Sequence, residues 1–234
     1  MLGNQTNLNR IKKLQVLGII LAISCSHALA KRGKWKVLFN GKSTEAWRGF
    51  RQSSLPGDVW KVENKSLTTI VGHQSIDVVT KEKYGDFELR LEWKIAPGGN
   101  SGIMYRVSYD FDETWKTGPE MQVLDDDKHR DGQNPKTSAG SLYGLIAPVN
   151  KSLKPVGRWN KVRIVVNKGH VEHWLNGRKV VEYDLLGPQL SPLIAASKFK
   201  DFPRFCRNDE GYIALQHHGD RVWYRKIRIR SLQF

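Results

Sequence analysis

The segment best suited to chemistry is the polar strand predicted at residues 119–125, which reads Pro-Glu-Met-Gln-Val-Leu-Asp. Side chains alternate between the two faces of a strand. Glu120 and Gln122 therefore point to one face, and Met121 and Val123 point to the other. A carboxylate and an amide share a polar face opposite an apolar one. This pattern is typical of a strand at the floor of a polar binding cleft.

A glycosidase that works with two carboxylates is the first chemistry to consider. Such enzymes place their two carboxyl groups about 5–9.5 Å apart. The residue two positions after Glu120 is Gln122, which can serve neither as an acid nor as a nucleophile. Asp125 lies about 16 Å away if the chain stays extended. Only a turn or a carboxylate from another strand would complete the pair, so a two-carboxylate glucanase stays open beside an inert, exposed Glu120.

A glycine-rich segment at residues 98–102 is followed by Arg106. Glycine allows unusual backbone angles and close approach of a ligand. The segment matches neither a phosphate-binding loop nor a dinucleotide-binding turn, because no helix is predicted after it. Arg106 is a candidate for binding a carbonyl or hydroxyl oxygen. The alternative is a turn between strands followed by a structural arginine.

The histidines offer a second base and a candidate metal site. His218 ends a predicted strand just before a glycine, which makes it the best functional candidate among the histidines. Their spacing matches no zinc motif. Glu120, Asp125 and one histidine, such as His129 in the following loop, could bind a divalent metal ion. Asp125 and His129 are the predicted metal ligands, and structural or exposed histidines are the alternative.

Residues 1–30 are predicted to be a secretory signal peptide. Basic residues at positions 10–13 precede an apolar run at 14–25, which is too short to span a membrane, and small residues follow at 28–30. A lipoprotein carrying the lipid on Cys25 is the less favoured alternative. The expected protein is secreted or periplasmic, has no membrane span, and comprises one domain at residues 31–234. With Cys206 as its only cysteine, it could form no internal disulfide.

The formal net charge of +15 would suit a nucleic acid or an anionic polysaccharide as partner. The basic residues are scattered along the chain, however. In their densest group, Arg228 and Arg230 alternate with Ile227 and Ile229, as on the solvent face of an amphipathic strand. We therefore predict no nucleic-acid partner and leave an affinity for acidic glycans or surfaces open.

Strand periodicity extends over almost the whole of residues 31–234, without a convincing helix. Residues 87–95 alternate strictly between apolar and polar. Hairpins are predicted at residues 60–70, 159–175 and 170–183, and two antiparallel strands at 211–216 and 222–232 close the chain. A β-sandwich or a barrel follows. The irregular segments 126–149 and 187–208 are predicted to be functional loops.

Taken together, these segments resemble the 3-keto-disaccharide hydrolase family of secreted bacterial proteins. The matching segments are residues 37–47, 86–89, 99–103, 120–125, 140–143, 159–160, 173–177 and 211–219. The resemblance implies an all-β, concanavalin A-like jelly-roll sandwich of two antiparallel sheets. It also implies cleavage of glycosides whose sugar carries a ketone at C3. His217 departs from the family, which often has an acidic residue there, so the charge of the site could differ.

A 3-keto substrate suits the local chemistry, and we derive the residue roles from it as a hypothesis. A ketone at C3 acidifies the C2 proton, so one base suffices, followed by elimination of the C1 leaving group and addition of water. Glu120 or His218 would be that base. Arg106, a bound metal, or both would hold the C3 oxygen. The expected substrate-binding residues are Asn100, Arg106, Gln122, Tyr143, His173 and Lys198. A non-catalytic, lectin-like carbohydrate-binding module is the alternative.

Overall fold

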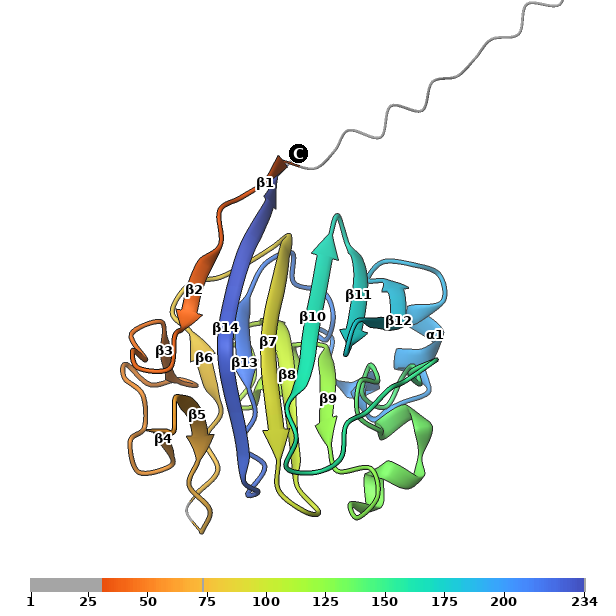
Figure 1. Ribbon diagram of the computed structural model, residues 1–234. Helices are drawn as coiled ribbons and strands as arrows, with labels where there is room; N and C mark the ends of the chain where they lie inside the picture. Colours follow the sequence, from red (N-terminus) through yellow and green to blue (C-terminus); the bar gives the residue numbers. More distant parts are fainter. Residues whose placement is uncertain (1–30, 73, 234) are drawn as a thin grey trace, which may run out of the picture.

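The structure, a computed structural model, describes residues 31–72 and 74–233. The predicted leader, residues 1–30, lies outside the described residues. The described chain forms two antiparallel β-sheets that pack face to face (Figure 1). This architecture confirms the predicted all-β sandwich of two antiparallel sheets.

No helix within the described residues is long and apolar enough to cross a membrane.

The larger sheet has nine strands. Seven follow one another in the order β12 (Arg178–Asp184), β11 (His170–Leu175), β10 (Asn160–Asn167), β7 (Phe87–Ile95), β14 (Val222–Gln233), β5 (Ser66–Thr69) and β4 (Trp60–Glu63). The short strands β1 (Lys31–Arg32) and β2 (Lys36–Phe39) also pair with β14. The long strand β14 therefore pairs with four other strands, β1, β2, β5 and β7, and lies beside β7 in Figure 1.

The smaller sheet has five strands and lies behind the larger one in Figure 1. Its order is β3 (Trp47–Gly49), β6 (Val78–Thr80), β13 (Tyr212–Leu215), β8 (Asn100–Val107) and β9 (Glu120–Leu124). The polar strand identified from the sequence is therefore β9, at the edge of this sheet.

The core fills the space between the inner faces of the two sheets. Leu89 and Leu91 of β7 and Ile103 of β8 contribute to it, with exposed fractions of at most 2%. Burying a side chain of this size stabilises the fold by about 1.5–3 kcal/mol. The strict alternation along β7 arises because its even-numbered residues face outward.

Most strand predictions are confirmed, while one pairing and the absence of helices are wrong. β7 spans the predicted residues, and the hairpin strands β4–β5 and β10–β11–β12 are paired as expected. The closing strands β13 and β14 do not pair, since they belong to different sheets. Periodicity predicts a strand but not its partner.

The helices are short pieces in the loops. They are α1 (Leu190–Ala195) and the 3₁₀ turns η1 (Thr114–Lys116), η2 (Arg130–Gln133), η3 (Pro135–Thr137) and η4 (Lys198–Asp201). Segments of six residues or fewer are too short to show a helical period in the sequence.

The two irregular loops predicted to be functional meet beside β9. The backbone N–H of Tyr143 donates to the Glu120 carbonyl at 3.1 Å, and that of Gly140 donates to the Gln122 carbonyl at 2.9 Å. From the second loop, Phe199 lies against Gly144. Figure 1 shows these segments in green and light blue on the side of the sandwich near β9. They bury the face of β9 that would otherwise be open to solvent.

Candidate functional site

Glu120 lies on the outer face of β9, while Met121 and Val123 enter the core, as the alternation predicted. Only 7% of Glu120 is exposed. Its carboxylate lies directly over Gly102 on the neighbouring strand β8, where an added Cβ would come within 2.0 Å of Oε1. A glycine on β8 thus makes the room that the carboxylate occupies. Among the described residues, no donor forms a hydrogen bond with this carboxylate.

The electrostatic surroundings of Glu120 favour its protonated form. The pKa of Glu120 is raised to about 8: burial is the main cause, Lys198 opposes the rise, and the negative charges of Asp77 and Asp131 add to it. Desolvation is the main cause, because a buried carboxylate loses the water that stabilises its charge. A carboxyl group with a pKa near neutrality is well matched to general acid–base catalysis.

Lys198, on η4, is the cation that acts on Glu120. Its Nζ lies 4.5 Å from the ring centres of both Trp115 and Tyr143, so two aromatic rings hold the ammonium group. Lys198 is exposed by surface area, but partial desolvation of its ammonium group lowers its pKa, and the charge of Glu120 opposes this shift. The Tyr143 hydroxyl donates to Asp131 at 3.1 Å, which fixes the ring. Lys198, Tyr143 and Glu120, each predicted as a site residue, are therefore brought together.

Asp77 is a second, half-buried carboxylate near Glu120. Burial raises the pKa of Asp77 to about 6. It accepts hydrogen bonds from the Thr114 hydroxyl and, at 2.9 Å, from the backbone N–H of His217. These bonds hold it in place and leave it less free than Glu120.

Sequence reasoning missed four members of this site. They are Asp77, Gly102, Trp115 and Asp131. Asp77 lies in a segment without a motif, so no signal could have found it. Asp131 lies in a loop predicted to be functional, and Gly102 lies in the glycine-rich segment, so both had a partial signal.

Two buried amide side chains on this face each have one polar atom without a hydrogen-bond partner. Asn100 and Gln122 lie on the same side of the sheet as Glu120, because they are two residues from Gly102 and Glu120 on their strands. Within the described chain, the Oδ1 atom of Asn100 and the Nε2 atom of Gln122 have no hydrogen-bond partner. Such groups are costly when buried, and the hydroxyls of a sugar could satisfy them. Their substrate-binding role stays a prediction.

Arg106 is corrected from a candidate ligand to a structural residue. Its guanidinium donates to the carbonyls of Gly85 and Asn208 and to the Asp86 carboxylate, each at 3.2 Å. These bonds tie three chain segments together, and only 8% of Arg106 is exposed. Because Nε, Nη1 and Nη2 each donate to the protein, Arg106 is not placed to bind a substrate oxygen. The alternative of a structural arginine is the one the structure supports.

His173 is likewise corrected, because it is fully buried in the core. Its Nε2 atom lies 2.8 Å from the Tyr105 hydroxyl, which in turn lies 2.5 Å from that of Tyr183. Burial lowers the pKa of His173 to about 4, so the ring is neutral. This network lies between the sheets, where no substrate can reach it.

His218 follows β13 and is exposed to solvent, and its role as a base stays a prediction. Its ring centre is 6.5 Å from that of His129, in an edge-on arrangement. The preceding His217 is turned inward instead, with Nε2 at 3.1 Å from the Ile70 carbonyl. Burial lowers the pKa of His217, so this departure from the family adds no charge to the site.

The residues predicted to bind a metal form hydrogen bonds with the local backbone, and their metal-binding role stays a prediction. Asp125 accepts backbone N–H bonds at both oxygens, from Gly98 at 2.7 Å and from Asp127 at 3.2 Å. His129 accepts the Asp131 N–H through Nδ1 at 3.1 Å. Asp125 shapes the turn beneath β9, and each of its carboxylate oxygens accepts one backbone N–H.

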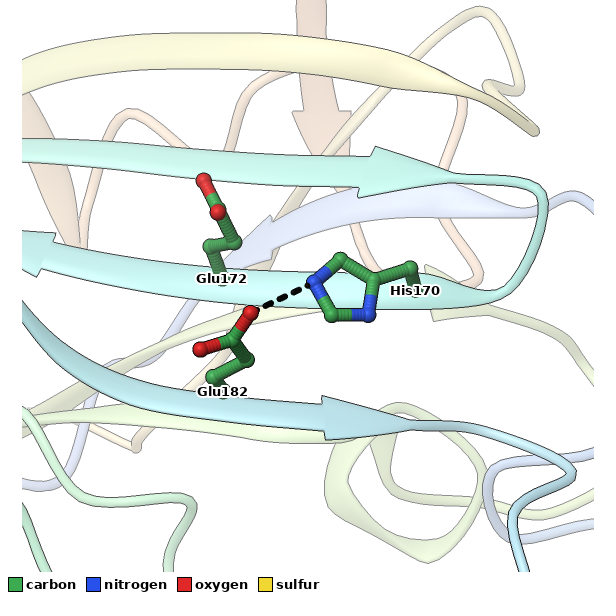
Figure 2. A group of neighbouring side chains, drawn as sticks. All are labelled: His170, Glu172 and Glu182. Carbon is green, nitrogen blue, oxygen red and sulfur yellow. Dashed lines mark hydrogen bonds and ion pairs between the residues drawn. The ribbon is translucent and has the colours of Figure 1, made fainter. Parts of the chain in front are cut away.

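In the described residues, one group of side chains has metal-ligand geometry, and it lies elsewhere. Figure 2 shows His170 and Glu172 on β11 beside Glu182 on β12, with ligand atoms within 4.8 Å of one another. Lys179 already places its Nζ at 2.5 Å from Glu182 and 3.5 Å from Glu172. This internal cation neutralises the cluster.

The fold and the site define a class: a two-sheet sandwich that holds a buried, loop-covered acid on its smaller sheet. The chain belongs to the family of the 3-keto-alpha-glucoside-1,2-lyase-like domain, whose profile matches residues 34–230. A 3-keto-disaccharide hydrolase of Bacteroides thetaiotaomicron is 36% identical over 225 residues, covering 83% of this chain and 77% of the relative. The resemblance drawn from the sequence is thereby confirmed.

Solved structures also superpose on this chain. A candidate glycosyl hydrolase from Parabacteroides distasonis superposes with a TM-score of 0.78 at 30% identity, covering 86% of this chain and 94% of its own. A family GH16 endo-β-1,3(4)-glucanase superposes with a TM-score of 0.52 at 11% identity, covering 87% and 96%, and shows the jelly-roll fold alone. The relatives support a glycosidase-like function for this chain.

Proposed function

We propose that this protein cleaves glycosides whose sugar carries a ketone at C3, with Glu120 as the base that removes the C2 proton. The observation that carries the proposal is the buried Glu120 carboxyl group, whose pKa is raised to about 8. The family description and the name of the Bacteroides relative both refer to 3-keto sugars, which supports this substrate class.

The reaction needs a single base because the substrate ketone supplies the acidity. The Glu120 carboxylate takes the C2 proton, and the electrons of that C–H bond move toward the C3 oxygen to form an enolate. When the C3 carbonyl forms again, a C1–C2 double bond forms and the C1–O bond breaks. The leaving oxygen takes up a proton. Water then adds across the C1–C2 double bond, so that the overall change is hydrolysis.

Lys198 is the group we assign to the enolate oxygen in place of Arg106. Its ammonium acts on the Glu120 charge without forming a direct salt bridge within the described residues. A fixed cation held by two rings needs no reorganisation when negative charge develops on the substrate. Asn100 and Gln122 would accept and donate hydrogen bonds to the sugar hydroxyls through their orphaned atoms.

The proposal is tested with a chromogenic 3-keto-glucoside beside its unoxidised parent. We expect cleavage of the keto compound alone, with deuterium from the solvent exchanging into C2 during turnover. Equal cleavage of the parent would favour a two-carboxylate glucanase, for which Asp77 and Asp131 are the candidate partners of Glu120. Tight binding of unmodified oligosaccharides without turnover of either compound would favour a lectin-like module.

Export from the cytoplasm is part of the same proposal. It rests on the sequence of residues 1–30, where a basic start, a short apolar run and small residues follow one another. Mass spectrometry of the protein from its native host is expected to find an N-terminus at Lys31. An intact N-terminus at Met1 would contradict it.

Replacing Gly102 by alanine is expected to displace the Glu120 carboxylate and leave the fold intact. The new methyl group would meet the flexible end of the Glu120 side chain rather than backbone. We expect kcat on the keto substrate to fall about tenfold to a hundredfold, since small misplacements of a catalytic group are costly. Gly57→Ala is the matched control, because nothing lies within 4 Å of its added Cβ. Unchanged turnover in Gly102→Ala would mean that Glu120 does not take part in the reaction.

A further inference from the structure

Three arginines form a row across the outer face of the larger sheet. Arg163 of β10 lies directly opposite Arg90 of β7, which lies directly opposite Arg228 of β14. Neighbouring strands are about 4.8 Å apart, so like charges recur at that spacing. Like charges placed directly opposite each other destabilise a sheet. A row that the fold alone would disfavour points to a function.

Two members of the row, Arg90 and Arg163, are held in place from below, together with the neighbouring Arg230. Glu88 has a side chain only 2% exposed and accepts hydrogen bonds from the Nε atoms of Arg90 at 2.8 Å, Arg163 at 3.0 Å and Arg230 at 2.9 Å. Burial alone would raise the pKa of Glu88, but the bonds from Arg230 and Arg90 lower it below its usual range. One buried carboxylate thus orients three guanidinium groups, whose charge it only partly cancels.

Aromatic rings flank the row at both ends. The Arg163 guanidinium lies 4.8 Å from the ring centre of Trp174. At the other end, Arg228 lies 4.7 Å from the ring centre of Trp35, and Arg90 lies 5.3 Å from it. Stacking on an aromatic face fixes the plane of a guanidinium while leaving its N–H edge available.

A groove of about 730 Å³ runs beside this row. Its charged lining comprises five cations, Arg90, Lys161, Arg163, Lys226 and Arg228, against one carboxylate, Glu92. That carboxylate is already paired with Arg225 at 2.7 Å and Lys226 at 3.1 Å. Lys161 and Arg228 are exposed, and no acidic partner is found for either within the described chain. An approaching ligand meets positive charge with the acidic groups lying beneath it.

We propose that this groove binds an anionic glycan, a polysaccharide that carries carboxylate or sulfate groups. Oriented guanidinium groups bind such oxyanions through paired N–H bonds, and a regular row of them suits a polymer with repeated charges. The net charge favours the same partner: it is +15 for the whole sequence and +12 without Arg10, Lys12 and Lys13 of the predicted leader. The choice of a glycan over other polyanions rests on the proposed function. The anionic character of the ligand rests on the charges of the groove alone. The groove lies on the opposite sheet from Glu120, so it would hold a polymer away from the reacting bond.

The test uses heparin and polygalacturonate as anionic probes, with dextran as the neutral probe, in isothermal titration against the purified protein. We expect binding of an anionic probe alone, with an affinity that falls steeply as salt rises. The double variant Arg228→Gln/Lys161→Gln should weaken binding about tenfold or more. Lys65→Gln/Lys128→Gln, which removes two exposed cations outside the groove, should change it less than about twofold.

The outcomes separate this proposal from the enzymatic one. Cleavage of the 3-keto-glucoside by Arg228→Gln/Lys161→Gln is expected to match that of the wild type. The proposed binding groove would be wrong if neither anionic probe bound at low salt. It would also be wrong if the two double variants lost binding affinity equally. Single-stranded DNA of matched length that binds as tightly as the glycans would overturn the glycan as its ligand. An unchanged unfolding midpoint in both variants shows that folding is not the cause.

Discussion

Replacing Glu120 by glutamine is expected to lower kcat on a 3-keto-glucoside about a thousandfold. Glutamine keeps the shape of the side chain but cannot take a proton, and a general base contributes about 10²–10⁴ to the rate. In the wild-type protein, turnover should rise with pH up to about 8 and level off above it, because the pKa of Glu120 is raised to about 8. Steady-state kinetics across this range measure both effects.

The same substitution is expected to stabilise the fold at alkaline pH. Glu120 binds its proton more tightly in the folded state, so the free energy of unfolding should fall as pH rises from about 4.5 to about 8. Glu120→Gln removes this loss, so its unfolding midpoint should exceed that of the wild type at pH 9 and match it at pH 4. The exposed Glu210→Gln is the control. Wild-type turnover in Glu120→Gln would eliminate Glu120 as the base.

Replacing Lys198 by glutamine is expected to lower kcat about a hundredfold or more. Removing one preorganised group that stabilises an oxyanion costs about 10²–10³ in rate. Lys198 also lowers the pKa of Glu120, so its loss should raise that pKa and move the rising limb of the pH profile upward. The deficit should therefore be larger at pH 7 than at pH 10.

Lys200→Gln is the matched control, since Lys200 lies on the same 3₁₀ turn η4 and is exposed. It should change neither kcat nor the pH profile. If the Lys198 variant loses rate without any shift in the rising limb of its pH profile, then Lys198 does not act on Glu120. The profile is needed because a purely structural role for Lys198 would lower the rate alone.

Much of the scaffold follows from local pattern. The alternation over residues 87–95 defines β7 with its bounds, and the apolar side of residues 120–124 enters the core as expected. The pairing of β13 with β8 and of β14 with β7 does not follow, since a strand with the right period can join either sheet. Contacts between distant segments choose the partner.

The residues of the site divide in the same way. Glu120, Gln122, Tyr143 and Lys198 could be chosen from their types, their periodicity and the resemblance to a family. Arg106 and His173 had equally suitable types, but the fold uses their polar atoms for internal bonds. Asp125 likewise bonds the backbone through both carboxylate oxygens. Side-chain chemistry names what a residue can do, and its partners decide what it is free to do.

The polar strand at residues 119–125 and the family were determined by the sequence itself, because alternation and ordered motifs are local properties of a chain. The raised pKa of Glu120 was decided by tertiary structure, since burial in the folded chain raises it most and the charges of Asp77 and Asp131, from two other segments, add to the rise. The basic residues scattered along the sequence likewise become a row only when β10, β7 and β14 lie side by side. Charge acts through space, and folding sets those distances.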